Sequence, residues 1–157
     1  MPTSIPERPK RMLAEGRSTQ PFENRDEELY RRYQLAHFVD GVLSNIGLPF
    51  PRFSVNRSSC SEPGDVLWDD EEERRFEGWG VLVFTVGEAR MELRTGDGRQ
   101  LGFDLEHNPL DLNYAHSEVI CFDTTTGTEV KNPSRMVQKQ YRAKISQAAR
   151  PIIPAES

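Results

Sequence analysis

The stretch Trp79-Gly-Val-Leu-Val-Phe-Thr-Val86 decides the fold, because it is the clearest strand in the chain. Its apolar side chains follow one another without alternation, which predicts a central strand that is covered on both faces. Residues 91–93 form a shorter strand, and Thr95-Gly-Asp-Gly-Arg99 marks a tight turn, since glycine supplies the positive φ that hairpins need. Residues 101–107 then pair back, and residues 114–122 add a further strand.

A helix is expected before this group of strands and another after it. Residues 25–45 carry apolar side chains at steps of three and four, with Asn24 as the N-cap, which predicts an amphipathic helix. Residues 135–149 repeat this pattern after the N-cap candidate Ser134. The first apolar stripe consists of Leu29, Tyr33, Ala36, Val39, Leu43 and Ile46, and the second of Val137, Tyr141, Ile145 and Ala148.

These elements predict an α+β fold, an antiparallel meander of about four strands flanked by an N-terminal and a C-terminal helix, because the strand connections are too short for parallel crossovers. A short strand over residues 53–55 is a further option. Residues 1–24 are rich in proline and charge and are expected to be a disordered tail. Residues 25–150 form one domain, and residues 151–157 are a flexible C-terminus.

The net charge of −5 in 157 residues is unevenly distributed. Residues 57–78 hold eight acids against three arginines, whereas residues 131–150 hold six bases and no acid. Such segregation indicates contact with a partner or an internal pairing of the two segments. The chain lacks a long apolar run and a secretory signal, so we expect a cytoplasmic, acidic protein without a membrane contact.

A possible reacting site lies between the last two strands. If residues 108–113 form the loop, His107 faces Tyr114, and His116 and Glu118 fall on the same face. A histidine beside a carboxylate can act as a general base, and two histidines with a glutamate can bind Zn²⁺. The alternative is a buried polar network. A slip of one residue in the pairing would separate these groups.

Two further segments could bind charged molecules. Arg52, Asn56 and Arg57 lie in a hydroxyl-rich stretch and could form an anion-binding loop, because guanidinium forks match phosphate and carboxylate; the alternative is a solvated loop. Arg135, Lys139 and Arg142 line one face of the C-terminal helix. They could contact nucleic acid, an acidic protein or only solvent.

The chain lacks the sequence motifs of P-loop ATPases, Rossmann oxidoreductases, zincin proteases and α/β-hydrolases. The leading hypothesis is therefore a non-catalytic accessory or interaction protein of a larger cytoplasmic assembly, with a protein partner and with neither a cofactor nor a metal. The rival is a small hydrolase or transferase for a phosphate-containing substrate such as RNA or a nucleotide. His116 would then be the base, His107 the acid, Glu118 the orienting group and Arg57 the phosphate ligand. A third hypothesis is nucleic-acid binding through the C-terminal helix.

Overall fold

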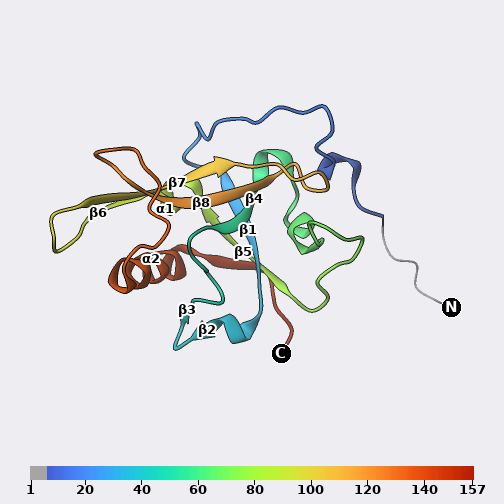
Figure 1. Cartoon of the computed structure of the whole chain (residues 1–157). Coiled ribbons are helices and arrows are strands. Elements are labelled where there is room, and N and C mark those ends of the chain that lie inside the picture. Colours follow the sequence, from blue (N-terminus) through green and yellow to red (C-terminus); the bar gives the residue numbers. More distant parts are fainter. Residues whose placement is uncertain (1–6) are drawn as a thin grey trace.

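The computed structural model describes residues 7–157, and its main feature is one curled antiparallel sheet of seven strands (Figure 1). The strand order is β6-β7-β8-β4-β1-β5-β9. The strands are β1 (Glu28–Tyr33), β4 (Phe53–Arg57), β5 (Gly80–Thr85), β6 (Met91–Arg94), β7 (Gln100–His107), β8 (His116–Asp123) and β9 (Arg150–Ile153). Two short strands, β2 (Phe38–Val39) and β3 (Val42–Leu43), form a separate hairpin.

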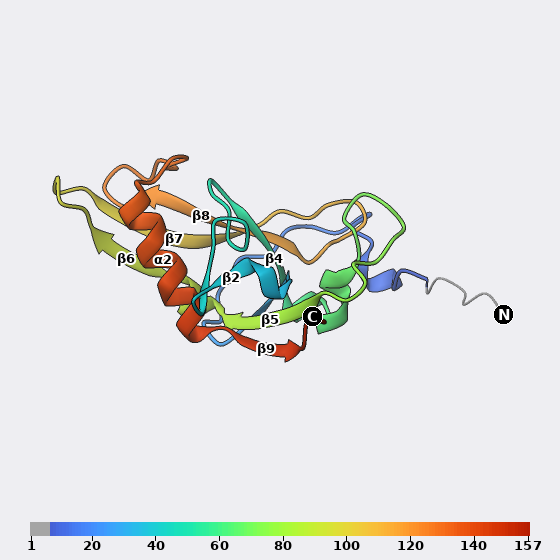
Figure 2. The same cartoon turned by 90° about the horizontal axis from the view of Figure 1, so that it is seen from below.

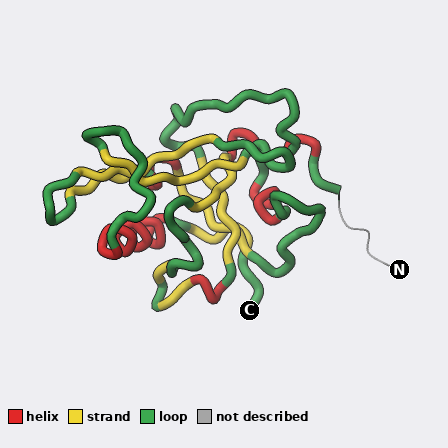
Figure 3. The backbone as a smooth tube through the Cα atoms, viewed as in Figure 1, coloured by secondary structure: helices red, strands yellow, loops and turns green. Residues whose placement is uncertain are grey.

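Helices contribute little to the described residues. Figure 3 shows one long helix, α2 (Arg135–Ala148), among strands and loops. The helix α1 (Val86–Ala89) is a single turn after β5. The described residues also contain four short 3₁₀ helices: η1 (Lys10–Met12), η2 (Leu35–His37), η3 (Ser58–Cys60) and η4 (Pro63–Leu67).

The predicted α+β meander between two helices is wrong, because the protein is mostly sheet and the expected N-terminal helix does not form. Residues 25–45 instead contain β1, η2 and the β2–β3 hairpin. Strand β1 pairs with β5 along its whole length, from Glu28 opposite Thr85 to Tyr33 opposite Gly80. These long-range backbone hydrogen bonds override the helical spacing of the apolar residues.

Several local predictions are confirmed by the structure. The apolar run before Val86 forms β5, which lies inside the sheet between β1 and β9. The expected hairpin around the glycine turn joins β6 and β7. Helix α2 begins after Ser134, whose side chain accepts a hydrogen bond from the Val137 backbone N–H. The short strand at 53–55 is part of β4.

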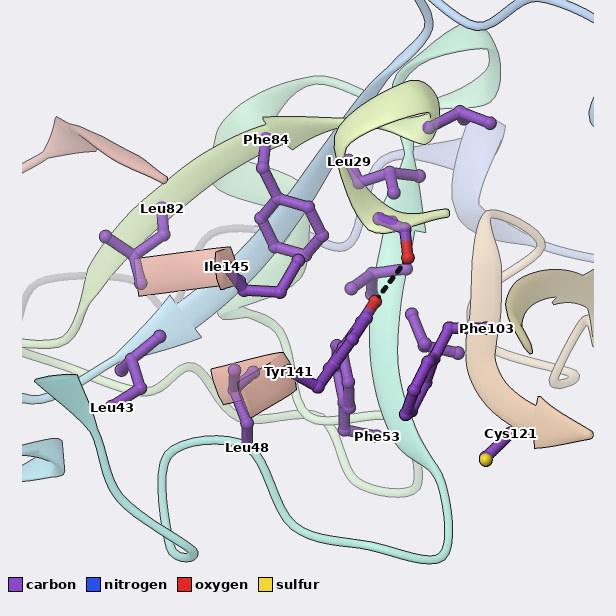
Figure 4. Close-up of a cluster of buried hydrophobic side chains, with 14 of the residues drawn as sticks. Leu29, Leu43, Leu48, Phe53, Leu82, Phe84, Phe103, Cys121, Tyr141 and Ile145 are labelled. Carbon is purple, nitrogen blue, oxygen red and sulfur yellow. Dashed lines mark hydrogen bonds between the residues drawn. The ribbon is translucent and has the colours of Figure 1, made fainter. Parts of the chain in front are cut away.

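Two apolar clusters cover opposite faces of the sheet. Helix α2 packs on one face of the sheet (Figure 2), and its side chains Val137, Tyr141 and Ile145 are buried in the main core. Figure 4 shows Tyr141 and Ile145 in this core. The Tyr141 ring stacks on Phe103 with centroids 3.9 Å apart, and its hydroxyl donates to the Ala89 carbonyl at 2.6 Å. On the other face, η4 covers β1 and β5; this smaller cluster comprises Tyr30, Val66, Leu67, Val81 and Val83.

The described part of the N-terminal segment lies along the sheet. Met12 is only 1% exposed, and its carbonyl accepts a hydrogen bond from the Tyr114 N–H. Residues 1–6 of the predicted disordered tail lie outside the described residues, and disorder of the tail stays a prediction. At the other end of the chain, residues 150–153 pair with β5 as strand β9.

Candidate functional site

The pairing of β7 with β8 differs from the register expected from the sequence. His107 lies opposite Ser117 rather than Tyr114, and Glu106 lies opposite Glu118. The residue opposite His107 is thus three positions further along β8 than expected. Because side chains alternate between the two faces of a sheet, a shift by an odd number of residues moves the expected neighbours to the opposite face. The predicted cluster therefore does not form as expected: His107 faces the core side of the sheet, whereas Glu118 faces the opposite side.

His107 is buried, and both of its ring nitrogens contact the backbone. Nδ1 accepts a hydrogen bond from the Gln20 N–H at 3.0 Å, so the proton is on Nε2, which donates to the Tyr114 carbonyl at 2.7 Å. Burial lowers the pKa of His107, which keeps the ring neutral. The Tyr114 hydroxyl donates to the Ser18 carbonyl at 2.5 Å. His107 and Tyr114 thus fasten the N-terminal segment to the sheet.

His116 and Glu118 take part in a second set of contacts on the other face. His116 Nδ1 lies 2.7 Å from the Asn108 carbonyl oxygen. Glu118 accepts from Asn108 Nδ2 at 2.6 Å and from Arg52 Nη1 at 3.2 Å. A hydrogen bond to Glu129 raises the pKa of Arg52 and, in return, lowers that of Glu129. Arg52 thereby ties β8 to the loop that carries Glu129.

The predicted anion ligands Arg57 and Asn56 are both engaged inside the protein. Arg57 forms a bidentate pair with Glu27, with Nη2–Oε1 and Nε–Oε2 distances of 2.8 Å and 3.0 Å. The two side chains are only 3% and 6% exposed. Asn56 accepts from Asn113 Nδ2 at 2.7 Å. Because Arg57 lies on the core face and Glu118 on the other, the structure does not bring together the groups that the catalytic hypothesis needs.

The predicted basic residues of the C-terminal helix, in contrast, do share one site. Arg135, Lys139 and Arg142 line a groove of about 450 Å³ between α2 and residues 42–45. Arg142 is held in place, because its Nε donates to the Leu48 carbonyl at 2.9 Å and its Nη2 to Gln138 Oε1 at 3.1 Å. Burial lowers the pKa of Arg142. We call this hollow the hairpin–helix groove.

The hairpin that forms the second wall of the groove was not predicted from the sequence. Strand β3 and residues 44–45 form this wall, β2 pairs with β3, and the Leu43 N–H donates to Ser146 Oγ of α2 at 2.8 Å, which fixes the hairpin to the helix. Val42 is 38% exposed at this wall, and Met136 on α2 is 71% exposed. The overlooked signal is the dipeptide Asp40-Gly41, whose residues have φ angles of 51° and 80° and form the hairpin turn.

No protein-family model matches the chain, and comparisons with curated proteins and with solved structures find no match. The fold and the site define a curled antiparallel β protein with a basic groove between a hairpin and a helix. None of the helices in residues 7–157 has the length and apolar character needed to cross a membrane. Over the same residues, no three His, Cys, Asp or Glu side chains are grouped to hold a metal ion.

Proposed function

We propose that this protein is a non-catalytic interaction protein of a larger cytoplasmic assembly, and that the hairpin–helix groove binds an acidic segment of a protein partner. The observation that carries the proposal is the composition of the groove. Its lining includes three cationic side chains and no carboxylate: Val42, Leu43, Ser44, Asn45, Arg135, Gln138, Lys139 and Arg142. Opposite charge on a partner steers its approach and fixes its register.

Two of the three cations are free to meet a partner. Arg135 and Lys139 are exposed, and neither forms an ion pair with a carboxylate of residues 7–157. Arg142 is already oriented by its backbone contact and lies over the Phe50 ring at 5.3 Å. A preorganised arginine loses little side-chain entropy on binding, so it is well suited to anchor a carboxylate.

Apolar side chains at the groove support a protein rather than a purely ionic ligand. Val42 is 38% exposed at the hairpin wall, and the same helix and hairpin also expose Met136 and Val39 outside the groove lining. Methionine and arginine are enriched at protein interfaces, whereas lysine and acidic residues dominate ordinary surface. An acidic segment that also carries apolar side chains therefore fits this surface.

Nucleic acid fits the groove less well. The net charge of −5 repels a polyanion at long range. The aromatic residue of α2, Tyr141, is fully buried in the core and offers no base-stacking surface. A protein segment needs no base-stacking surface, and its few carboxylates are repelled less at long range than the continuous charge of a nucleic acid.

Reversal of the two free cations is expected to abolish partner binding. The double substitution Arg135→Glu with Lys139→Glu places like charges against an acidic segment, and we expect affinity to fall more than about tenfold. Arg135 is in the first helical turn, where glutamate suits the helix dipole, so the fold is expected to tolerate the change. The measurement is quantitative mass spectrometry of proteins that co-purify from the native host with each form.

The matched control is Lys10→Glu with Arg94→Glu, which changes the net charge equally at two exposed positions away from the groove. The proposal predicts that an acidic partner is retained by the wild type and by the control, and is lost from the groove variant. Equal recovery from all three forms would contradict the proposal, as would a monomer that recovers no partner at all.

A further inference from the structure

A second hollow lies where β1 separates from β4. The two strands pair only at Leu29 with Arg57 and at Tyr30 with Asn56, whereas β1 continues to pair with β5 as far as Tyr33. The opening forms a pocket of about 220 Å³. Its lining includes Arg31, Arg32, His37, Ser54, Phe76 and Trp79. None of these residues belongs to the hairpin–helix groove or to the sites expected from the sequence.

Two successive arginines of β1, Arg31 and Arg32, line the pocket, although side chains alternate along a strand and these two leave β1 on opposite faces of the sheet. Arg31 spans the opening, where its Nε donates to the Gly47 carbonyl at 2.8 Å and its Nη1 to the Ser54 carbonyl at 2.7 Å. Arg32 Nη1 donates to the Val66 carbonyl at 3.0 Å. Within residues 7–157, Nη2 of each guanidinium has no hydrogen-bond partner. Both arginines therefore keep N–H donors that a ligand can use.

The charges of these two arginines are not balanced by direct ion pairs. Among the described residues, no carboxylate lies at ion-pair distance from either guanidinium, whereas the buried Arg57 has Glu27. Burial lowers the pKa of Arg31 to about 9, and repulsion by Arg32 contributes. Burial also lowers the pKa of Arg32, although the nearby carboxylates of Asp70 and Asp69 partly oppose the shift. Both guanidiniums stay charged near neutral pH, and a bound anion would relieve their repulsion.

Aromatic rings form the walls of the pocket and shield these charges from water. The Arg32 guanidinium lies 4.1 Å from the Phe76 ring centroid, and the Trp79 ring packs against Phe76 at 5.1 Å. His37 meets Trp79 edge to face at 5.3 Å. Its Nδ1 accepts from the Gln34 N–H, so the proton is on Nε2, which is a further donor. Apolar walls strengthen ionic hydrogen bonds by lowering the local dielectric constant.

We propose that this pocket binds a phosphate dianion, either inorganic phosphate or the phosphoryl group of a larger molecule. Two guanidiniums match a double negative charge, whereas one carboxylate would leave a cation uncompensated. The volume of about 220 Å³ is below the range of about 300–1,000 Å³ typical for drug-sized ligands, so it suits a phosphoryl group rather than a whole nucleotide. Binding here is independent of the hairpin–helix groove.

Isothermal titration calorimetry of the full chain at constant ionic strength tests the site. The ligands are inorganic phosphate, glycerol 3-phosphate and, as a monovalent control, acetate. We expect phosphate or its ester to bind, and Arg32→Gln to weaken binding by about tenfold or more through loss of a charge-assisted hydrogen bond. Arg74→Gln is the matched control, because Arg74 also lies over the Phe76 ring at 5.1 Å but is exposed and does not line the pocket.

A preference for inorganic phosphate would identify the free ion as the ligand, and equal or tighter binding of the ester would identify a phosphoryl group. The proposal would be overturned if neither ligand bound, if Arg32→Gln and Arg74→Gln had equal effects, or if acetate bound equally tightly.

A second measurement uses the wild type and does not depend on the folding of any variant. The indole N–H signal of Trp79 is expected to shift during a phosphate titration followed by NMR, while that of Trp68, outside the pocket, stays in place. An unmoved Trp79 signal would contradict the site.

Discussion

Replacement of Tyr141 by alanine is expected to lower the free energy of unfolding by about 3–5 kcal/mol. The side chain is fully buried, stacks on Phe103 and donates to the Ala89 carbonyl at 2.6 Å (Figure 4). The substitution leaves a cavity at the point where α2 meets the sheet and orphans a buried carbonyl. It also loosens the helix that forms one wall of the groove.

Urea unfolding followed by circular dichroism measures this effect. Tyr141→Phe keeps the ring and removes only the hydroxyl, so we expect a loss of about 1–2 kcal/mol. Met136→Ala on the exposed face of α2 is the control, and its effect is expected to stay within about 0.5 kcal/mol. If Tyr141→Ala were as mild as Met136→Ala, the packing of α2 described above would be incorrect.

Removal of the Glu27 carboxylate is expected to be nearly as damaging. Glu27→Ala leaves the Arg57 guanidinium buried without its bidentate partner, and loss of one member of a buried pair costs about 3–5 kcal/mol. Arg57 also donates to the carbonyls of Gln20 and Pro21 and lies 3.8 Å from the Phe22 ring centroid. The substitution is therefore expected to release the N-terminal segment as well, which faster trypsin cleavage at Arg17 would reveal.

The pH dependence of stability gives an independent check on Glu27. Although burial acts to raise the pKa of Glu27, hydrogen bonds from Arg57 and Ser59 outweigh it, and the pKa is lowered from its ordinary value of 4.5. A carboxyl group with a lower pKa in the folded state stabilises the protein above its unfolded pKa, and this contribution disappears as the pH falls through the folded pKa. The difference in unfolding free energy between wild type and Glu27→Gln should thus be constant near neutral pH and shrink below about pH 4.5. A difference that grew on acidification would contradict the ion pair.

The sequence predicted the elements with strong local signals and missed those that long-range pairing decides. The run that forms β5, the glycine turn between β6 and β7, and the N-cap of α2 were all recognisable because neighbouring residues determine them. Strand β1 was not recognisable, because its apolar residues also fit a helical stripe and its partners β4 and β5 lie far along the chain. The Asp40-Gly41 hairpin turn was a local signal against that helix.

The candidate sites show the same limit. The basic residues of α2 could be grouped from their spacing, because a helix fixes which side chains share a face. The arrangement of the histidines could not be predicted, because an error of three residues in the strand register places His107 and Glu118 on opposite faces of the sheet. The pocket around Arg31 and Arg32 depends on the separation of β1 from β4, which no sequence pattern indicates.

Site-specific photo-crosslinking shows whether the hairpin–helix groove binds an acidic protein segment. Val42→p-benzoylphenylalanine places a photoreactive group on the exposed hairpin wall of the groove, opposite α2. In the native host, we expect one protein to crosslink through an acidic segment, and we expect the additional changes Arg135→Glu and Lys139→Glu to abolish the product. A crosslink that survives these changes, or that joins the groove to nucleic acid or to a basic segment, would rule out an acidic protein segment as the ligand of the groove.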